Sequence, residues 1–593
     1  MNKLRRVVNN TVISLLGQAV TWISTLVLTI AYGRFLGDTK FGELYFAITF
    51  VALIGFPIEF GFNQQLTREI AQEPQKALRY LSNTLVIKLV LWLLLYGCIL
   101  LACRLLGYDV EERMLVAICG LVLLSTAITN AFAALHYAFE RVVFPVVGTI
   151  LEKGLAALIG VILLRHGVGV ELMAMVLLGG ALSNAVWQAF WFFRLEGISF
   201  TIDLSLIRDL IHTSIPFLVY GVLGVIYYRV DTVLLSLMTN ATVVGWYGAG
   251  YRLFDTLVFL PNLVILAVMY PVFSKLSITD EANLKLAIEK SMNFLLFCGV
   301  PIATGLIVAA PNIIGFLYHR AEFSPSIPVL QALAPGVVFL YINTVLTTTL
   351  ISTKQEKKIT IMAAAALVFN LGLNLFLIPR FEQIGAAAVT SLTEFLLLCI
   401  AVALTPRYLL PLKSLRVAGK TILASLIMAL ALQSVHMFNI FVILAVAVPV
   451  YFVGVTILRT IPRKDLQELY RAIRNKAQRT STVLLNQEIT KESERATEDL
   501  VCLDDEETMP MKALRGLAGN KVQQMNPYVS DCQNEETVPM KALRGLAGSK
   551  VQQMNPKESE IATEDLVCLD DEETVPMKAL RGIAWHQRDS KSD

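Results

Sequence analysis

The chain has 593 residues, of which 55% are hydrophobic and 16% are charged. Soluble domains carry about 25% charged residues, so the excess of apolar side chains is expected to face lipid. The net charge of +3 comes without a dense basic face, which argues against a nucleic-acid partner and leaves membrane lipids as the primary one.

Long apolar runs recur along the chain. A helix needs roughly twenty apolar residues to cross a hydrocarbon core of about 30 Å. This length predicts an all-α, polytopic membrane protein with about fourteen transmembrane helices. In chain order they are expected near residues 11–32, 41–61, 81–103, 114–136, 143–164, 170–193, 210–238, 243–271, 292–317, 328–351, 359–379, 384–405, 417–436 and 439–459.

Basic residues alternate between the two sets of connections. The connections on the side of the N-terminus carry roughly eighteen lysines and arginines and the opposite set roughly seven, so the positive-inside rule places both termini in the cytoplasm. No connection of the opposite set exceeds about ten residues. This leaves no room for a domain with catalytic acids, and the chain is therefore not expected to be an enzyme.

The eight cysteines indicate no metal site or disulfide framework. Five of them lie in apolar runs, where a thiol usually behaves as a small buried hydrophobic group. The other three lie in a polar C-terminal segment without metal-ligand spacing. No cofactor is therefore expected.

Two neighbouring spans contain charged residues at membrane depth. Arg229 and Asp231 lie in GVIYYRVDTVLLSLM, and Arg252 and Asp255 lie in GAGYRLFDTLVFLP. Such residues cost several kcal/mol unless they pair or face a water-filled cavity. Arg252 and Asp255 are one turn apart and can pair, whereas Arg229 and Asp231 point to different sides. The fork of an arginine suits phosphate oxygens, so Arg229 is either a phosphate site or half of a structural ion pair.

Further ionisable residues lie inside predicted spans, and four of them are candidates for a functional role. Lys88 is expected to line a central cavity unless it lies near a helix end. Glu59, Glu152 and Glu394 are candidates for coupling to a proton or sodium ion, because a buried carboxylate prefers to be protonated or to bind a cation. Glu59 lies near the predicted cytosolic end, where a wetted carboxylate is a plain alternative.

The chain becomes polar after Arg459. Residues 463–478 have helical spacing and a basic face, which predicts an amphipathic helix on the inner leaflet or in the cytosol. Within residues 480–593, KESERATEDLVCLDDEETMPMKALRGLAG returns as KESEIATEDLVCLDDEETVPMKALRGIA. The copies are irregularly spaced and cannot form a solenoid. This cytosolic tail is expected to be mostly disordered, with a docking segment for a cytosolic partner as the alternative.

Three segments resemble one family of transporters. The start, NNTVISLLGQAVTWISTLVLTIAYGRFLGDTKFGELYFAITF, is similar to the opening of bacterial oligosaccharide flippases of the O-antigen and polysaccharide export type, with their R-x-L-G-x-x-x-x-G turn. GFNQQLTREIAQ and RVDTVLLSLMTNATVVGWYGAGYRLFD resemble the same family. In the last segment the matching residues are Asp231, Gly245, Tyr247, Gly250, Tyr251, Arg252 and Leu253.

This resemblance implies the fold of a superfamily that also contains multidrug extruders and lipid II flippases. Two six-helix lobes, residues 1–193 and 207–405, would surround a central cavity, and two additional helices would follow at 416–459. The implied duplication has a trace in the sequence, because YGRFLGDTKFGELYFAITF and LSLMTNATVVGWYGAGYRL place Gly42 and Gly245 in correspondence.

The resemblance also implies the function. A polyprenyl pyrophosphate-linked oligosaccharide would move from the cytosolic to the outer leaflet of a bacterial cell membrane by alternating access, in concert with polysaccharide-assembly proteins. The expected substrate-binding residues are Arg229, Asp231, Arg252, Asp255, Lys88, Tyr227 and Tyr228. One alternative is a cation-coupled multidrug extruder, whose cavity should be acidic. A membrane glycosyltransferase or polymerase is a second alternative, which the short outer connections oppose.

Overall fold

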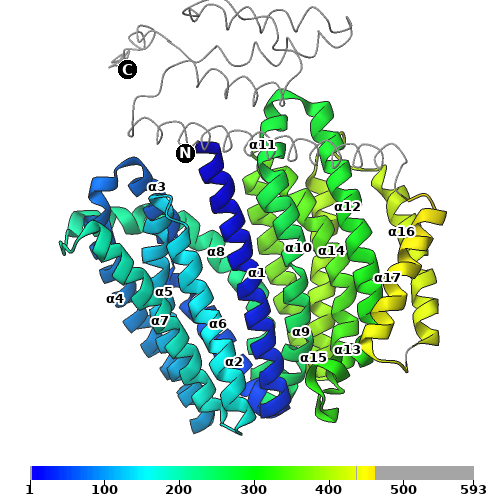
Figure 1. The fold of residues 1–593 in the computed structure, drawn as a ribbon, viewed down its shortest axis with the longest axis horizontal. Coiled ribbons are helices and arrows are strands. Elements are labelled where there is room, and N and C mark those ends of the chain that lie inside the picture. Colours follow the sequence, from blue (N-terminus) through cyan, green and yellow to red (C-terminus); the bar gives the residue numbers. More distant parts are fainter. Residues whose placement is uncertain (1–2, 60, 436, 461–593) are drawn as a thin grey trace, which may run out of the picture. The chain divides into compact units, whose positions relative to one another are not determined.

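The computed structural model describes residues 3–59, 61–435 and 437–460. Every regular element among these residues is helical (Figure 1), which confirms the predicted all-α class. The predicted helix at 463–478 and the repeat-containing segment 480–593 lie outside the described residues.

Seven α-helices form the first half of the described chain. They are α1 (Lys3–Leu36), α2 (Asp38–Gly55), α3 (Phe62–Gln72), α4 (Ala77–Leu105), α5 (Val110–Ala138), α6 (Val143–Arg165) and α7 (Val170–Glu196). Two short 3₁₀ turns, η1 (Phe56–Ile58) and η2 (Pro74–Lys76), lie on either side of α3. Below, the end of the bundle at which α1 stops is called the distal end, and the end near Lys3 is called the proximal end.

The second half continues with α8 (Leu204–Met238), α9 (Ala241–Leu257), α10 (Phe259–Pro261), the π-helix η3 (Asn262–Met269), α11 (Tyr270–Thr279) and α12 (Glu281–Val308). It ends with α13 (Ala310–Tyr318), the turn η4 (Ala321–Phe323), α14 (Ser326–Ser352), α15 (Glu356–Leu404), α16 (Ser414–Ser434) and α17 (Ile440–Ile457). The predicted span 243–271 is interrupted near Pro261, because proline cannot donate the helical hydrogen bond.

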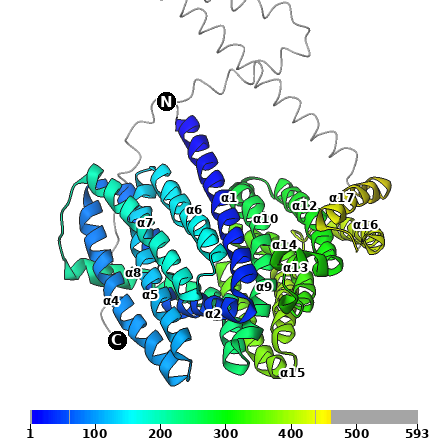
Figure 2. The same cartoon turned by 60° about the horizontal axis from the view of Figure 1, so that its bottom comes forward.

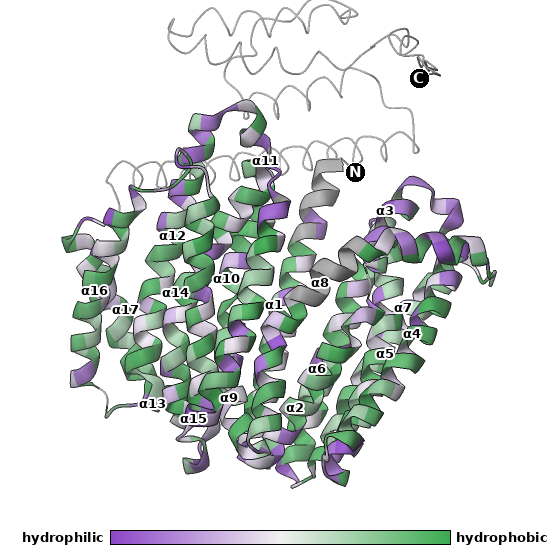
Figure 3. Cartoon of the chain, turned by 180° about the vertical axis from the view of Figure 1, so that it is seen from behind, coloured by the Kyte–Doolittle hydropathy of each residue, from purple (hydrophilic) through white to green (hydrophobic). Residues whose placement is uncertain are grey.

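Apolar side chains cover the middle of the helices, while hydrophilic residues gather at the helix ends (Figure 3). Large apolar side chains such as Leu94 and Val186 are more than 60% exposed, which a lipid environment accommodates. Among the described residues, twelve helices are long and apolar enough to cross a membrane. The chain is therefore a multi-pass membrane protein, and the count of fourteen stays a prediction.

Helix α15 covers two of the predicted spans. Its 49 residues would measure roughly 73 Å as one straight helix, but Glu382, with φ 45° and ψ −125°, reverses the chain direction. The Lys358 ammonium consequently lies 3.1 Å from the carbonyl oxygen of Leu404. The predicted spans 359–379 and 384–405 are thus two antiparallel arms of one element.

The helices pack in groups that follow the chain. In the first half, α1 packs on α6, and α5 packs on α4 and α7; in the second half, α14 packs on α12, on α9 and on α15. Helices α16 and α17 pack on each other, and α16 packs on α12 (Figure 2). The lobe boundaries at 193 and 207 remain a prediction.

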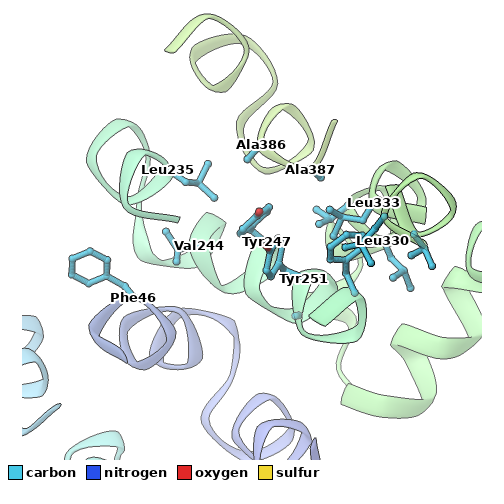
Figure 4. Packing of buried hydrophobic residues seen from close by; sticks show 14 of the residues in the cluster. Phe46, Leu235, Val244, Tyr247, Tyr251, Leu330, Leu333, Ala386 and Ala387 are labelled. Atoms are coloured by element: carbon cyan, nitrogen blue, oxygen red, sulfur yellow. The ribbon is translucent and has the colours of Figure 1, made fainter. Parts of the chain in front are cut away.

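The core between α8, α9, α14 and α15 is built around two tyrosines of α9. Tyr247 and Tyr251 are at most 2% exposed and lie among Leu235, Leu330 and the small residues of the second α15 arm (Figure 4). The Tyr247 hydroxyl donates to the carboxylate of Asp231 on α8. This contact places one of the predicted site residues inside the core.

Helices α2 and α9 touch backbone to backbone at the distal end. A Cβ atom on Gly42 or on Gly245 would clash with the carbonyl oxygen of the residue four positions before the other glycine. From the same two helices, Thr39 and Thr242 share a hydrogen bond of 2.9 Å between their hydroxyls. Such reciprocal contacts are those that a two-fold axis produces. They bring together the two glycines that the sequence placed in correspondence.

Two arginines join the halves at the same end. The Arg34 guanidinium donates to the carbonyl oxygens of Phe316, at 2.6 Å, and Leu317, at the end of α13. Arg320 donates to the carbonyl oxygens of Arg34 and Phe35, at 2.8 and 3.3 Å, at the end of α1. Because helix C-termini carry unpaired carbonyls and partial negative charge, each arginine caps the other's helix. The close contact of α2 and α9 at Gly42 and Gly245 forms a glycine crossing. Together with this glycine crossing, these caps hold the distal end closed.

The connection between α7 and α8 is fastened to α4. Asn83 donates to the carbonyl oxygen of Thr201 at 3.0 Å and accepts from the N–H of Asp203 at 2.7 Å. The Asp203 carboxylate caps α8 and pairs with Arg79. The hydroxyl of Ser205 and the guanidinium of Arg79 hold the pKa of Asp203 well below its usual range. The two halves are therefore linked by an ordered segment.

Replacing a glycine inside a helix by alanine usually raises stability, but at the glycine crossing it is predicted to lower it. Gly42→Ala should lower the free energy of unfolding by about 1–3 kcal/mol, because the added methyl forces α2 and α9 apart. The matched control is Gly97→Ala on α4, where a Cβ would meet nothing within 4 Å, so that better helix propensity should leave stability unchanged or raised. Thermal unfolding of both variants in detergent measures the difference, and equal melting temperatures would contradict it.

Candidate functional site

A cavity of about 380 Å³ lies between the two halves. Its wall comes from α1, α2, α5, α6, α7, α8 and α9. Phe41 and Tyr45 of this wall flank Gly42, so the glycine crossing bounds the cavity toward the distal end. Most of the wall is apolar, and its polar groups are few and placed by specific helices.

The cavity lies at mid-depth of the bundle. Arg229 lies nine residues before Met238 on α8, and Arg252 lies eleven residues after Ala241 on α9. With a rise of about 1.5 Å per residue, both are roughly 15 Å from the distal end. A bilayer core of about 30 Å places them near its centre.

The charged side chains of the wall are mainly basic. Arg229, Arg252 and Lys153 line the cavity, and Glu152 is the acidic residue among the described lining residues. Glu152 is already neutralised, since it pairs with Lys153 at 2.6 Å and accepts from the side-chain amide of Asn184 at 2.8 Å. The wall is therefore cationic overall.

Arg229 forms an ion pair and also lines the cavity. Its guanidinium lies 3.5 Å from the carboxylate of Asp255, an ion pair between α8 and α9. Its side chain nevertheless keeps 31% of its surface exposed and lines the cavity. Arg229 can thus face an anion while Asp255 compensates part of its charge.

Arg252 has a different environment. The sequence suggested that it pairs with Asp255, one turn away, but Asp255 faces Arg229 instead. No salt bridge joins Arg252 to any acidic side chain within the described ranges 3–59, 61–435 and 437–460. Among the described residues of the wall, it is therefore the cation without an acidic partner.

Asp231 does not reach the cavity. It is 2% exposed, accepts from the Tyr247 hydroxyl and from the N–H of Thr232, and is not among the described lining residues. A carboxylate held by two donors in the core ties α8 to α9. Its predicted part in substrate binding stays a prediction.

Lys88 lies in a polar cluster within the first half, away from the cavity. Its ammonium is 3.0–3.1 Å from three acceptors, which are Glu59, Asn63 and the carbonyl oxygen of Ala127. The Lys88 side chain is 1% exposed. Glu59 also accepts from Asn130 at 2.9 Å. The cluster pairs a buried cation with its counter-charge, so that Glu59 has a basic partner within the protein.

Glu394 occupies a third polar cluster, in the second half. It is 3% exposed and accepts from the Tyr227 hydroxyl at 2.7 Å and from the side-chain amide of Asn343 at 2.8 Å. Among the described residues no basic side chain lies within salt-bridge distance of it. Tyr228, the neighbour of Tyr227, is 41% exposed and is not among the described lining residues.

Several wall residues escaped the analysis of the sequence. Thr25, Thr29 and Tyr32 of α1 line the cavity together with Tyr45 of α2. The signal was a stripe of hydroxyl residues at helical spacing in the first span, since residues three and four apart share one helix face. Each threonine of this stripe donates to the carbonyl oxygen four residues earlier, at 2.8 Å.

Two family models match the chain. The model described as "Polysaccharide biosynthesis protein" matches residues 7–277. The model described as "Lipid II flippase MurJ" matches residues 154–458. Together the two matches extend over all the helices from α1 to α17.

Two curated relatives come from the archaeon Haloferax volcanii. The chain is 22% identical over 372 residues to the probable low-salt glycan biosynthesis flippase Agl15, a match that covers 61% of this chain and 75% of the relative. It is 25% identical over 212 residues to the probable flippase AglR, covering 35% of this chain and 44% of the relative.

Solved structures share the fold. A lipid II flippase MurJ in an inward closed conformation superimposes with a TM-score of 0.63 at 15% identity, covering 76% of this chain and 98% of that one. An inward-facing multidrug transporter of the MATE family superimposes with a TM-score of 0.53 at 14% identity, covering 65% and 93%. At such identities the likeness concerns the fold alone, and it confirms the predicted architecture.

The buried Lys88–Glu59 pair predicts a large effect on stability. Glu59→Gln leaves the ammonium of Lys88 buried without a counter-charge and should lower the free energy of unfolding by about 3–5 kcal/mol. Adding Lys88→Met to this variant removes the uncompensated charge and should recover part of the loss. Chemical unfolding in detergent measures both.

The control for this pair is Glu73→Gln, which breaks an exposed ion pair of 2.6 Å with Lys76. Exposed pairs contribute about 0–1 kcal/mol, so this variant should unfold almost like the wild type. If the single Glu59 variant were as stable as the double variant, the buried charge would not be the cause.

Proposed function

Because the chain belongs to the lipid II flippase MurJ family, we propose that it is a flippase that carries a lipid-linked oligosaccharide across the membrane. The observation that carries this proposal is the cationic cavity at mid-depth of an apolar helix bundle. A phosphate-bearing head group needs such a sheltered, positively charged space, because a bare charge in hydrocarbon costs several kcal/mol.

The chemistry of the wall favours an anionic substrate. Arg252 offers a guanidinium without an acidic partner among the described residues, and Arg229 adds a second, partly compensated one. Arginine forks bind phosphate oxygens with two parallel hydrogen bonds. We propose that Arg252 is the principal contact of the phosphate group and that Arg229 assists it.

The two alternatives fit less well. An extruder of cationic drugs needs an acidic cavity, whereas the carboxylate of this wall is paired with Lys153. A glycosyltransferase or polymerase needs free catalytic acids, and the relatives with curated descriptions are flippases. The substrate would accordingly leave the protein chemically unchanged.

Location and direction follow from the same proposal. The positive-inside rule places the proximal end in the cytoplasm, so the closed distal end would face outward. The substrate would enter from the cytosolic leaflet and leave on the outer side by alternating access. The expected bacterial origin stays a prediction, since the curated relatives are archaeal, and so do the polysaccharide-assembly partners.

Among the three carboxylates proposed for ion coupling, Glu394 is the best candidate. Lys88 compensates Glu59, and Lys153 compensates Glu152. Glu394 is buried beside two neutral donors. A buried carboxyl group without a basic partner binds either a proton or a metal cation, and either would couple the second half to an ion gradient.

The role of Arg252 can be tested by transport. Arg252→Ala should lower the flipping rate of a fluorescent polyprenyl pyrophosphate-linked saccharide by tenfold or more, because a charge-assisted fork to phosphate is lost. Arg252→Lys, which keeps the charge without the fork, should retain part of the activity. The assay uses the purified chain in proteoliposomes.

A matched control for Arg252 is Arg194→Ala. The Arg194 guanidinium lies 5.9 and 5.8 Å from the ring centres of Phe190 and Trp191, on α7, and does not line the cavity. This variant should flip at the wild-type rate. Normal flipping by a correctly inserted Arg252→Ala variant would remove the proposed phosphate site.

Ion coupling gives a second test. Glu394→Gln keeps the shape of the side chain and removes its charge, so substrate affinity should change less than about twofold, while stimulation by an imposed sodium or proton gradient should disappear. Glu73→Gln at an exposed turn is the control. An undiminished response of the Glu394 variant to both gradients would contradict the assignment.

A further inference from the structure

Two tyrosine hydroxyls beside the cavity have no hydrogen-bond partner among the described residues. They belong to Tyr32 of α1 and Tyr45 of α2, and both residues line the cavity. Tyr32 is only 5% exposed. Buried hydroxyls are nearly always hydrogen-bonded, because leaving one unpaired costs the desolvation of the group. Two such hydroxyls in one wall point to a ligand.

The two tyrosines are close to the basic residues of the wall. Tyr32, Tyr45, Arg229 and Arg252 all line the same cavity. The ring of Tyr45 is fixed by its neighbours. It stacks on Phe41 with ring centres 6.1 Å apart. A ring carbon of Tyr45 also lies 2.8 Å from the position that a Cβ atom on Gly248 would occupy. The hydroxyl is therefore held in place before a ligand arrives.

Several other polar groups of the wall are already occupied. The hydroxyls of Thr25 and Thr29 donate to carbonyl oxygens of their own helix. Lys153 is paired with Glu152, and Arg229 with Asp255. Arg252 and the two tyrosine hydroxyls are thus among the donors of this wall that no described residue engages.

We propose that Tyr32 and Tyr45 donate hydrogen bonds to the phosphate oxygens of the substrate and, with Arg252, form the site for the phosphate or pyrophosphate of a polyprenyl lipid. This inference rests on the proposed function and adds the groups that position the head group. Phenol hydroxyls suit this task, since they donate to an anion without adding charge. A site with few fixed charges also lets the substrate leave.

The experiment measures binding of farnesyl pyrophosphate to the full chain in detergent by calorimetry, with farnesol as the ligand that lacks phosphate. Wild-type protein should bind the pyrophosphate and not farnesol. Tyr32→Phe and Tyr45→Phe, which remove one oxygen each, should each raise the dissociation constant about tenfold, as expected for a lost hydrogen bond to a charged group.

Tyr341→Phe is the matched control, because its buried hydroxyl already donates to the carbonyl oxygen of Leu257 at 2.9 Å and does not line the cavity. Its affinity should equal that of the wild type. Melting temperatures identify any variant that fails to fold, and in that case the affinity of the other phenylalanine variant decides.

Two outcomes separate this inference from the proposed function. If Arg252→Ala loses the pyrophosphate while both phenylalanine variants bind like the wild type, the role of the tyrosines is wrong and the cationic site stands. If wild-type protein binds farnesol and farnesyl pyrophosphate equally well, the phosphate site itself is wrong.

Discussion

A charge at the centre of a lipid bilayer must have a counter-charge, hydrogen-bond partners or water, and this requirement orders the polar groups of the bundle. Lys88 meets it through Glu59, and Asp231 through neutral donors in the core. Where the described residues provide no such partner, as at Arg252, the side chain lies on the wall of a cavity. The unpaired groups therefore mark the place where a polar substrate can be sheltered.

Closure of the distal end depends on a second constraint, which is close backbone approach. Gly42 and Gly245 let α2 and α9 touch, and the arginine caps of α1 and α13 add charge-assisted hydrogen bonds at the same end. The caps bind carbonyl oxygens that helix ends leave unpaired. These contacts can be released without exposing a buried charge, which suits a joint that opens and closes during transport.

The cavity wall and the closed end share structural elements. Tyr45 lies on α2 three residues after Gly42 and packs over Gly248 of α9. A movement of α2 against α9 would therefore displace this wall residue and open the closed end at the same time. Arg229 and Asp255 also connect α8 to α9 across the wall. Binding of a ligand to Arg252 and the tyrosines would therefore affect the position of the helices that close the distal end.

By itself, the sequence determined the membrane class, the approximate spans and the small set of charged residues that matter, because the length of an apolar run and the cost of a buried charge are local properties. It also placed Gly42 opposite Gly245 in a faint repeat. Only the tertiary structure decided the partner of each charge. Asp255 faces Arg229 rather than Arg252, Lys88 lies away from the cavity, and Tyr32 and Tyr45 line it. These outcomes depend on how each helix is rotated against helices distant in the chain, which no local pattern encodes.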